Sequence, residues 1–319
     1  MVRQWWPWLA LAAVLAVAAY TRLTALDLMD FKADEAELAA LAQAVVAGQW
    51  PATSIRTSLG PDNPPLPVYI FALPALFTRD PMGLAMANGA LNVAAVVGAF
   101  LLGQRFFCRR VGLAAAAFYA ADAYAVVFVR KPAGTFLEPA GAVLVLWFLL
   151  AAVSGKRWAW AGAFCSWGLL LQLHWGTALV LPVLVVLFVI LSVERRIPYP
   201  VQGILRSTGT GVVPALIGLA AAAALFVPYA IRELASKPDF VRALSGAAGG
   251  APATWSLDSF RWVWILVSSP AYGDVTGAAS GLFRAESWPA GWLAPVIGAA
   301  VVGGLIVALA RWWQPRYLA

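Results

Sequence analysis

The sequence predicts an all-α membrane protein: a polytopic bundle of about eight transmembrane helices, with further helices lying at the outer membrane surface. Of its 319 residues, 62% are hydrophobic and only 12% are charged, which is about half the charged share of an ordinary soluble domain. Several apolar runs approach 20 residues, the length that a helix needs to cross a bilayer. No soluble domain or repeat is evident, so residues 1–319 are interpreted as a single transmembrane domain.

The apolar runs place the spans along the chain, with two long loops between them. The first loop, 26–83, includes an apolar stretch at 66–77 that a proline and a polar break keep too short to span, so we expect a surface helix there. The second loop, 232–288, contains a Trp/Phe-rich segment at 255–267 that we also expect to be a surface helix. The spans are expected at about 5–25, 84–104, 111–129, 137–153, 158–174, 177–193, 211–231 and 290–310.

The distribution of charge predicts the orientation in the membrane. The short loops 105–110, 154–157 and 194–207 hold three, two and three basic residues and a single acid, whereas the opposite loops hold thirteen of the fifteen acids. Because Lys and Arg in short loops mark the cytoplasmic side, both termini are expected in the cytoplasm and the long loops outside the inner (plasma) membrane. The net charge of +7 is therefore a topology signal, and no nucleic-acid partner is expected. A signal peptide cleaved near residues 16–18 is the alternative for the first run.

Cysteine and histidine are too scarce for several kinds of site. Cys108 is expected in an inner loop and Cys165 within a span, so neither favours a disulfide, and no Cys/His zinc spacing is present. The single histidine, His174, excludes a metal site built from several histidines.

The densest carboxylate cluster follows directly after the first span and comprises Asp34, Glu35 and Glu37. An acid three residues before another acid, followed by an apolar-periodic run from Leu38, predicts a capping box with Asp34 as the N-cap and a helix that ends near Gly48. One interpretation is therefore an amphipathic surface helix with a good cap. The other is a catalytic site, because capping uses one carboxylate and three lie within four residues.

The catalytic interpretation has a definite chemistry. Transfer of a sugar from a lipid phosphate to a hydroxyl group needs a base that accepts the hydroxyl proton. The leaving phosphate needs positive charge rather than a proton donor. A carboxylate at the outer face, opposite Arg130 and Lys131, would meet both demands. A divalent metal ion held by Asp34 and Glu35 would add to the positive charge, since hard cations prefer oxygen ligands.

These residues resemble the first outer loop of GT-C fold glycosyltransferases, and above all glycosyltransferase family 39, which includes protein O-mannosyltransferases and the bacterial aminoarabinose transferases of lipid A. The first match is Phe31-x-x-Asp34-Glu35-x-Glu37 at the start of a helix after the first span. Further matches extend the resemblance over about residues 1–195, and they are Gly48-x-Trp50-Pro51, Pro64-Pro65-Leu66-x-x-Tyr69, the loop 130–138 and Gln172-x-His174.

The resemblance implies a polyprenyl-phosphate-linked sugar as the donor, and a single displacement would invert the sugar carbon. It assigns the acceptor-activating base to Asp34, and to Glu35 a role in positioning the acceptor, the donor phosphate or a metal. The acceptor is left open between a glycan, a lipid and a protein. Members of the family usually continue for more spans, so we expect either a C-terminally truncated fragment or a short relative without its acceptor-binding part.

Several further residues have both a structural and a functional interpretation. Arg130 and Lys131 either snorkel to the interface or bind the donor phosphate, and two adjacent cations on the outer side favour phosphate. His174 is either a hydrogen-bonded histidine at the interface or a further donor to that phosphate. Asp122, an acid within a span, either hydrogen-bonds to a neighbouring tyrosine or lines the cavity. Glu138 is either the ion-pair partner of the two cations or a second acid of the site. The residues expected to line the cleft are Glu37, Asn63, Pro65, Tyr69, Asp122, Glu138 and Gln172.

Two other classes of function remain open. A lipid or small-molecule transporter or flippase usually shows internal repeats and broken helices with polar sites at the membrane midplane. This sequence shows no repeat and only one acid within an expected span. A non-catalytic subunit of a membrane assembly is the third class. The sequence favours the transferase because the acidic cluster and the paired cations are both expected on the outer face.

Overall fold

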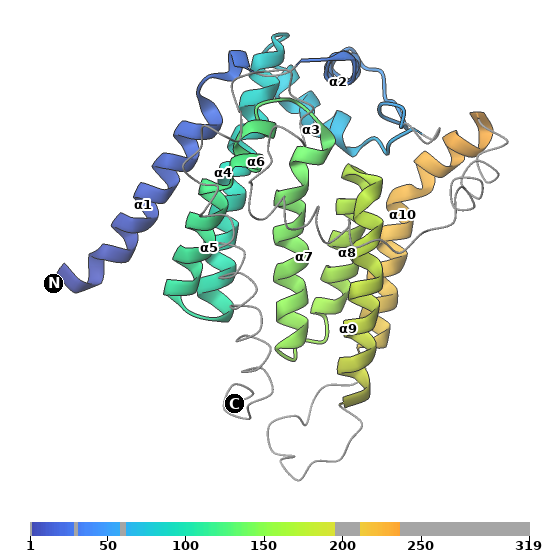
Figure 1. Ribbon diagram of the computed structural model, residues 1–319. Coiled ribbons are helices and arrows are strands. Elements are labelled where there is room, and N and C mark those ends of the chain that lie inside the picture. The colour runs from blue at the N-terminus through green and yellow to red at the C-terminus, as the bar shows by residue number, and fades with distance from the viewer. Residues whose placement is uncertain (1, 29–30, 58–61, 195–210, 237–319) are drawn as a thin grey trace, which may run out of the picture. The chain divides into compact units, whose positions relative to one another are not determined.

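The computed structural model describes residues 2–28, 31–57, 62–194 and 211–236. Within these ranges the regular elements are all helices, and a single isolated bridge joins Arg56 to Asp62. The predicted all-helical class is therefore confirmed for the described part of the chain (Figure 1). The elements are α1 (Val2–Leu23), η1 (Leu26–Leu28), α2 (Ala33–Val46), α3 (Leu66–Ala75), α4 (Pro81–Phe106), α5 (Arg109–Ala121), α6 (Ala123–Phe128), η2 (Gly134–Leu137), α7 (Glu138–Val153), α8 (Ala159–Leu173), η3 (Trp175–Leu179), α9 (Val180–Glu194) and α10 (Val212–Ser236).

Four helical segments in the described ranges are long and apolar enough to cross a membrane. The apolar helix α8 has 15 residues, which extend over about 22 Å at the rise of an α-helix, less than the roughly 30 Å of a bilayer core. The expected surface helix at 255–267 and the expected span at 290–310 lie outside the described residues. The four membrane-length segments are Trp5–Leu23, Pro81–Phe106, Gly134–Val153 and Val212–Ala235.

The start of α2 differs from the prediction. The N-cap is Lys32, whose backbone N–H donates to Glu35 Oε2 at 2.9 Å, so Asp34 lies inside the first turn and the predicted Asp34 cap is wrong. Asp34 and Glu35 are still favourable in the first turn, because the N-terminus of a helix carries partial positive charge. The end of α2 agrees with the prediction: Gly48 follows the last turn with φ +88°, a left-handed conformation that suits glycine.

The expected span at 111–129 is interrupted at Asp122. This residue has an extended backbone, with φ −63° and ψ 112°, and it separates α5 from α6. Its Oδ1 accepts a hydrogen bond from the backbone N–H of Ala125 at 2.6 Å. Asp122 is thus the N-cap of α6, which corresponds to the structural interpretation, although its hydrogen-bond donor is a backbone group rather than a tyrosine.

The buried apolar side chains form two clusters. One lies between α1, α4 and α5 and includes Val96, Phe100 and Ala116. The other joins α2 and α3 to α7, α8, α9 and α10 and includes Leu38 and Trp160. Helix α4 also packs against α7, where the rings of Phe106 and Trp147 meet edge to face with their centroids 5.4 Å apart. The helices that carry the candidate residues are therefore held by continuous packing.

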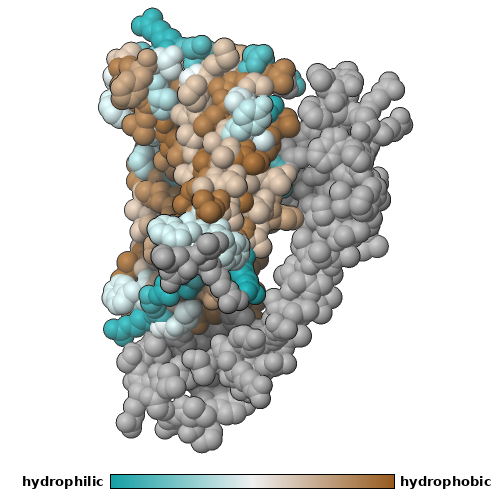
Figure 2. All heavy atoms as spheres, turned by 90° about the vertical axis from the view of Figure 1, so that its left-hand side faces the viewer, coloured by the Kyte–Doolittle hydropathy of each residue, from teal (hydrophilic) through white to brown (hydrophobic). Residues whose placement is uncertain are grey.

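The described helices have two distinct ends. In Figure 1, α2 and α3 lie at one end of the bundle, here called the α2 end, and the α4–α5 and α7–α8 turns lie at the other, here called the basic end. Apolar side chains cover the middle of the face shown in Figure 2, and hydrophilic residues collect toward its ends. This pattern suits a bilayer. At the basic end, Arg105 lies in the last turn of α4, Arg109 and Arg110 begin α5, and Lys156 and Arg157 lie between α7 and α8.

Candidate functional site

An ion pair joins the acidic turn of α2 to the segment between α6 and α7, residues 129–137, here called the α6–α7 connection. Lys131 Nζ lies 3.1 Å from Glu35 Oε1, and the two side chains are only 17% and 5% exposed. The second carboxylate oxygen, Oε2, accepts the backbone N–H of Lys32. Both oxygens of Glu35 are therefore occupied. A pair with so little exposure is largely removed from water, so each charge depends on its partner.

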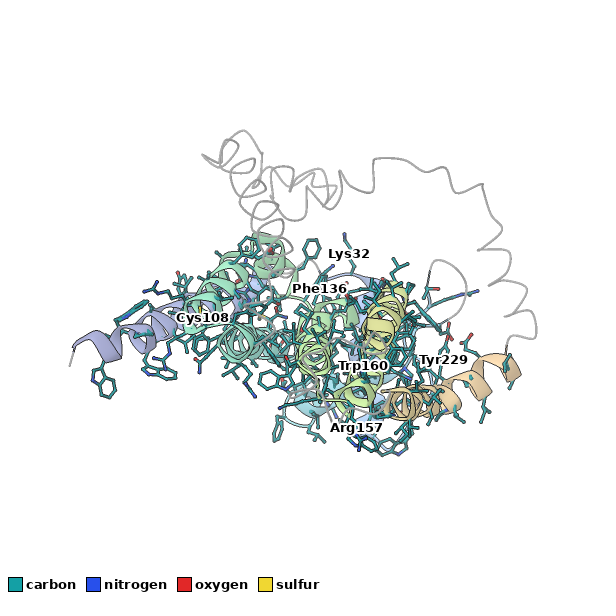
Figure 3. The ribbon with its side chains drawn as sticks, turned by 90° about the horizontal axis from the view of Figure 1, so that it is seen from below. Lys32, Cys108, Phe136, Arg157, Trp160 and Tyr229 are labelled. Carbon is teal, nitrogen blue, oxygen red and sulfur yellow. The ribbon has the colours of Figure 1, made fainter. Side chains whose placement is uncertain are left out.

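Two aromatic rings accompany the Lys131 ammonium group. Its nitrogen lies 5.7 Å from the ring centroid of Phe128 and 5.8 Å from that of Phe136. The two ring centroids are themselves 5.2 Å apart. These distances are within the range of cation–π attraction, so the rings stabilise the charge that Glu35 pairs with. Figure 3 marks Phe136 on the α6–α7 connection and Lys32 at the start of α2.

Arg130 adopts a different position from its neighbour. Its Nη2 donates to the backbone carbonyl of Thr21 at 3.0 Å, near the end of α1. Its buried Nε has no hydrogen-bond partner among the described residues. No described contact links Arg130 to Glu35, so of the two cations predicted to bind the donor phosphate, Lys131 is the one in contact with the acidic turn.

Asp34 and Glu37 are both exposed, in contrast to the buried Glu35. Consecutive residues of an α-helix point about 100° apart around the axis, so Asp34 cannot share the inward direction of Glu35. None of the hydrogen bonds or ion pairs within the described ranges uses the Asp34 carboxylate. This carboxylate is the one in the first turn of α2 that could accept a proton from a substrate.

A second pair lies where α7 begins. His174 Nδ1 is 3.3 Å from Glu138 Oε1, and the side chains are 42% and 29% exposed. Glu138 therefore pairs with His174 rather than with Arg130 or Lys131, which corrects the pairing considered above. The same Nδ1 lies 3.2 Å from the backbone N–H of Gly176. One nitrogen cannot serve both groups at once: it accepts from Gly176 when unprotonated and donates to Glu138 when protonated.

The two pairs lie on the same stretch of chain. The α6–α7 connection carries Lys131, and Glu138 follows its last residue directly. Between them, Gly134 fits closely against α3 and the end of α8: a Cβ atom there would lie 2.8 Å from Pro67 Cγ and 2.8 Å from the Leu173 carbonyl oxygen. Segments distant in sequence, α2, α3 and α8, thus meet around this connection.

The other candidate residues make structural contacts. The carbonyl of Ile55 accepts hydrogen bonds from both the backbone N–H of Asn63 and its Nδ2, at 2.8 and 3.1 Å. Pro65 is the N-cap of α3. Tyr69 Oη donates to the carbonyl of Pro51 at 2.6 Å, and burial raises the pKa of this tyrosine. Gln172 is 4% exposed and donates to the Leu225 carbonyl at 2.8 Å, which links α8 to α10.

Three buried polar residues escaped the sequence reasoning. Arg22 is fully buried and donates to the carbonyls of Tyr119 and Ala120, at 2.7 and 2.9 Å, where α5 ends. Asn88 and Asn92 are 0% and 2% exposed on α4. Polar side chains inside apolar helices are costly and usually face the protein interior. Their presence in apolar segments of the sequence could therefore have indicated these three residues. All three side chains donate hydrogen bonds to backbone carbonyls, at places where a helix ends or where the chain between helices is irregular.

Few oxygen ligands for a divalent metal ion are free of other contacts in the first turn of α2. Hard cations need several oxygen ligands, but both Glu35 oxygens are engaged, which leaves Asp34 alone in this turn. The described residues contain no group of three or more His, Cys, Asp or Glu side chains that could hold a metal. The Asp34–Glu35 metal site stays a prediction, in which Asp34 would be the ligand that makes no other described contact.

Comparisons with known proteins do not assign the chain to a family. Searches against protein-family models, curated proteins and solved structures found no significant match. The resemblance to glycosyltransferase family 39 thus depends on the sequence motifs alone. Without this resemblance, the described structure shows apolar helices suited to a membrane and a buried ion pair between the first turn of α2 and the α6–α7 connection.

Proposed function

We propose that this chain is a membrane glycosyltransferase of GT-C type, similar to family 39, that transfers a sugar from a polyprenyl phosphate to an acceptor hydroxyl. The main support is the Glu35–Lys131 ion pair, which brings a cation against the turn that presents the exposed Asp34 carboxylate. A base and a cation near each other are what this transfer needs. The protein would lie in the plasma membrane, with the α2 end facing outward and both termini on the cytoplasmic side.

In the proposed reaction, the Asp34 carboxylate accepts the proton of the acceptor hydroxyl. The hydroxyl oxygen attacks the anomeric carbon of the donor sugar, and the bond between that carbon and the phosphate oxygen breaks. The bonding electron pair stays on the polyprenyl phosphate, whose increased negative charge the Lys131 ammonium stabilises. Lys131 has three N–H donors and one carboxylate partner, so it can bind phosphate while its pair with Glu35 persists.

The other candidates have supporting roles in this proposal. His174 is half-exposed beside Glu138 and, when protonated, provides a second positive group for the donor phosphate. Glu35 orients Lys131 rather than taking part in proton transfer, because its two oxygens are already bonded. Arg130 holds the end of α1 through the Thr21 carbonyl. The acceptor remains a glycan, a lipid or a protein.

The decisive experiment supplies membranes containing the protein with a labelled polyprenyl-phosphate sugar. Asp34→Asn is expected to slow transfer about 10²- to 10⁴-fold, the usual contribution of a general base. Asp27→Asn, which changes another exposed acid near the α2 end, is the control and should keep the parent rate. Near-normal transfer by Asp34→Asn would refute the assigned base. Movement of labelled lipid across the membrane without product would favour a flippase instead.

A further inference from the structure

Two asparagines form a polar stripe on α4. Asn88 and Asn92 are four residues apart, so they lie on the same face of the helix. They are among its most buried side chains, with 0% and 2% of their surface exposed. Burying an amide in an apolar bundle costs free energy unless its hydrogen bonds are made. An apolar residue would pack more cheaply at either position, so the bonds that these amides make are informative.

Both amides bind the α6–α7 connection. Asn88 Nδ2 uses both of its hydrogens, one to the Val129 carbonyl at 3.1 Å and one to the Lys131 carbonyl at 2.9 Å. Asn92 Nδ2 donates to the Phe136 carbonyl at 2.9 Å, and Asn92 Oδ1 accepts the hydroxyl of Tyr119. Backbone carbonyls that are buried outside regular helices need hydrogen-bond donors from the protein. Asn88 and Asn92 thus bind this irregular segment near both ends.

The bonded carbonyls belong to Lys131 itself and to residues at or next to the two rings beside its ammonium group. Asn88 binds the backbone of Lys131 itself and of Val129, the residue after Phe128. Asn92 binds the backbone of Phe136, the second ring beside the ammonium. Hydrogen bonds at these carbonyls fix the backbone that carries both rings and the Cα atom of Lys131. We infer that Asn88 and Asn92 are positioning residues that hold the Lys131 ammonium against Glu35. On the proposed function, this places the ammonium for the donor phosphate.

The test measures the coupling between Glu35 and Lys131 by thermal unfolding of the full-length protein in detergent. In the parent, Glu35→Gln and Lys131→Met each leave one buried charge unpaired, whereas the double variant removes both. The fall in Tm of the double variant should therefore be smaller than the sum of the single falls. In an Asn88→Leu background this non-additivity should disappear. A merely structural Asn88 would lower every Tm and leave the non-additivity unchanged.

Two further variants make the result decisive. Gln172→Leu removes a buried amide with an equivalent bond to a carbonyl, between α8 and α10, and should preserve the parent coupling. Asn88→Ser, which has a single donor, covers the case in which Asn88→Leu does not fold, and it should weaken the coupling partly. Undiminished coupling in Asn88→Leu, or in Asn88→Ser if that is the variant that folds, would overturn the inference.

A kinetic measurement connects the inference to the proposed reaction. In the transfer assay, Asn88→Leu should raise the donor KM about tenfold, the effect of losing one well-placed charged contact. The acceptor KM should stay unchanged. The unfolding measurement requires no sugar transfer, so it can fail while the transferase proposal stands. Equally, a parent protein without transfer activity would leave the coupling result valid.

Discussion

The Glu35–Lys131 pair places opposite charges where little water reaches them. Removing one partner of such a pair leaves the other charge buried and unpaired, which costs about 3–5 kcal/mol. We therefore expect Lys131→Met or Glu35→Gln to destabilise the protein strongly in thermal denaturation. Glu37→Gln, an exposed acid two residues along α2, is the matched control and should change stability by less than about 0.5 kcal/mol. Equal effects of Glu35→Gln and Glu37→Gln would contradict the burial of this pair.

The same residues show what sequence can reveal about single side chains. Three carboxylates within four residues are visible in the sequence. Which of them turns inward depends on how α2 packs against the α6–α7 connection, so the sequence could not separate Glu35 from Asp34. Nor could it separate Lys131 from Arg130, since their different partners, Glu35 and Thr21, come from segments distant in the chain.

Helices α1 and α4 approach closely at Gly89. A Cβ atom at this position would lie 2.7 Å from the Arg22 carbonyl oxygen, which belongs to the backbone and cannot move away cheaply. Overpacking of this kind usually costs about 1–3 kcal/mol, so Gly89→Ala should lower Tm in a thermal unfolding experiment. At Gly141 the nearest atom is the end of a flexible side chain, Leu170 Cδ1 at 2.8 Å. Gly141→Ala should therefore cost less, and the reverse order would contradict this packing of α1 on α4.

One side chain caps the helix that follows the break between α5 and α6. Asp122 caps α6 through the Ala125 N–H, and replacing a capping Asp with Ala typically costs about 0.5–2 kcal/mol. Asp122→Ala should lower Tm by a corresponding amount, while Asp122→Asn should retain most of the stability because asparagine is an equally good cap. If both variants lost the same stability, the negative charge rather than the cap would be what matters.

Hydropathy predicts helical elements well and their interruptions poorly. The run 111–129 is apolar enough to suggest one span, and nothing in its average composition shows that Asp122 would end one helix and begin another. Likewise, the acid spacing that suggested a cap at Asp34 fits equally well a helix that begins two residues earlier, after Lys32. A cap depends on the local backbone conformation, which the pattern of residue types leaves undetermined.

For the whole molecule, the sorting of charge between loops predicts that the basic loops share one side, and two of the three lie within the described residues. The basic turns were expected on one side, and in Figure 1 the α4–α5 and α7–α8 turns lie at the opposite end from α2 and α3. Loop charge is a property of composition and needs no knowledge of packing, and the side of the membrane that these turns face stays a prediction. The number of spans was harder to predict from the sequence, because α8 and the segment Trp175–Ile190 are apolar but short. Hydropathy alone does not decide how such helices sit in a bilayer.

The orientation of the bundle can be tested with thiols at its two ends. Cys108 is exposed in the turn between α4 and α5, at the basic end. Trp50 is 73% exposed just after α2, at the α2 end. If Lys and Arg mark the cytoplasmic side, an impermeant maleimide added outside intact cells should label Trp50→Cys in a background lacking the native cysteines. The same reagent should spare Cys108 in a Cys165→Ala protein.

Inverted membrane vesicles should give the opposite labelling, since they expose the cytoplasmic side. Labelling of both sites from the same side would contradict a bundle with these two ends across the membrane. Labelling of Cys108 from outside and of Trp50→Cys from inside would leave the bundle intact but reverse it. Asp34 and Lys131 would then face the cytoplasm, and the proposal of transfer on the outer face would be wrong even if the ion pair behaves as described.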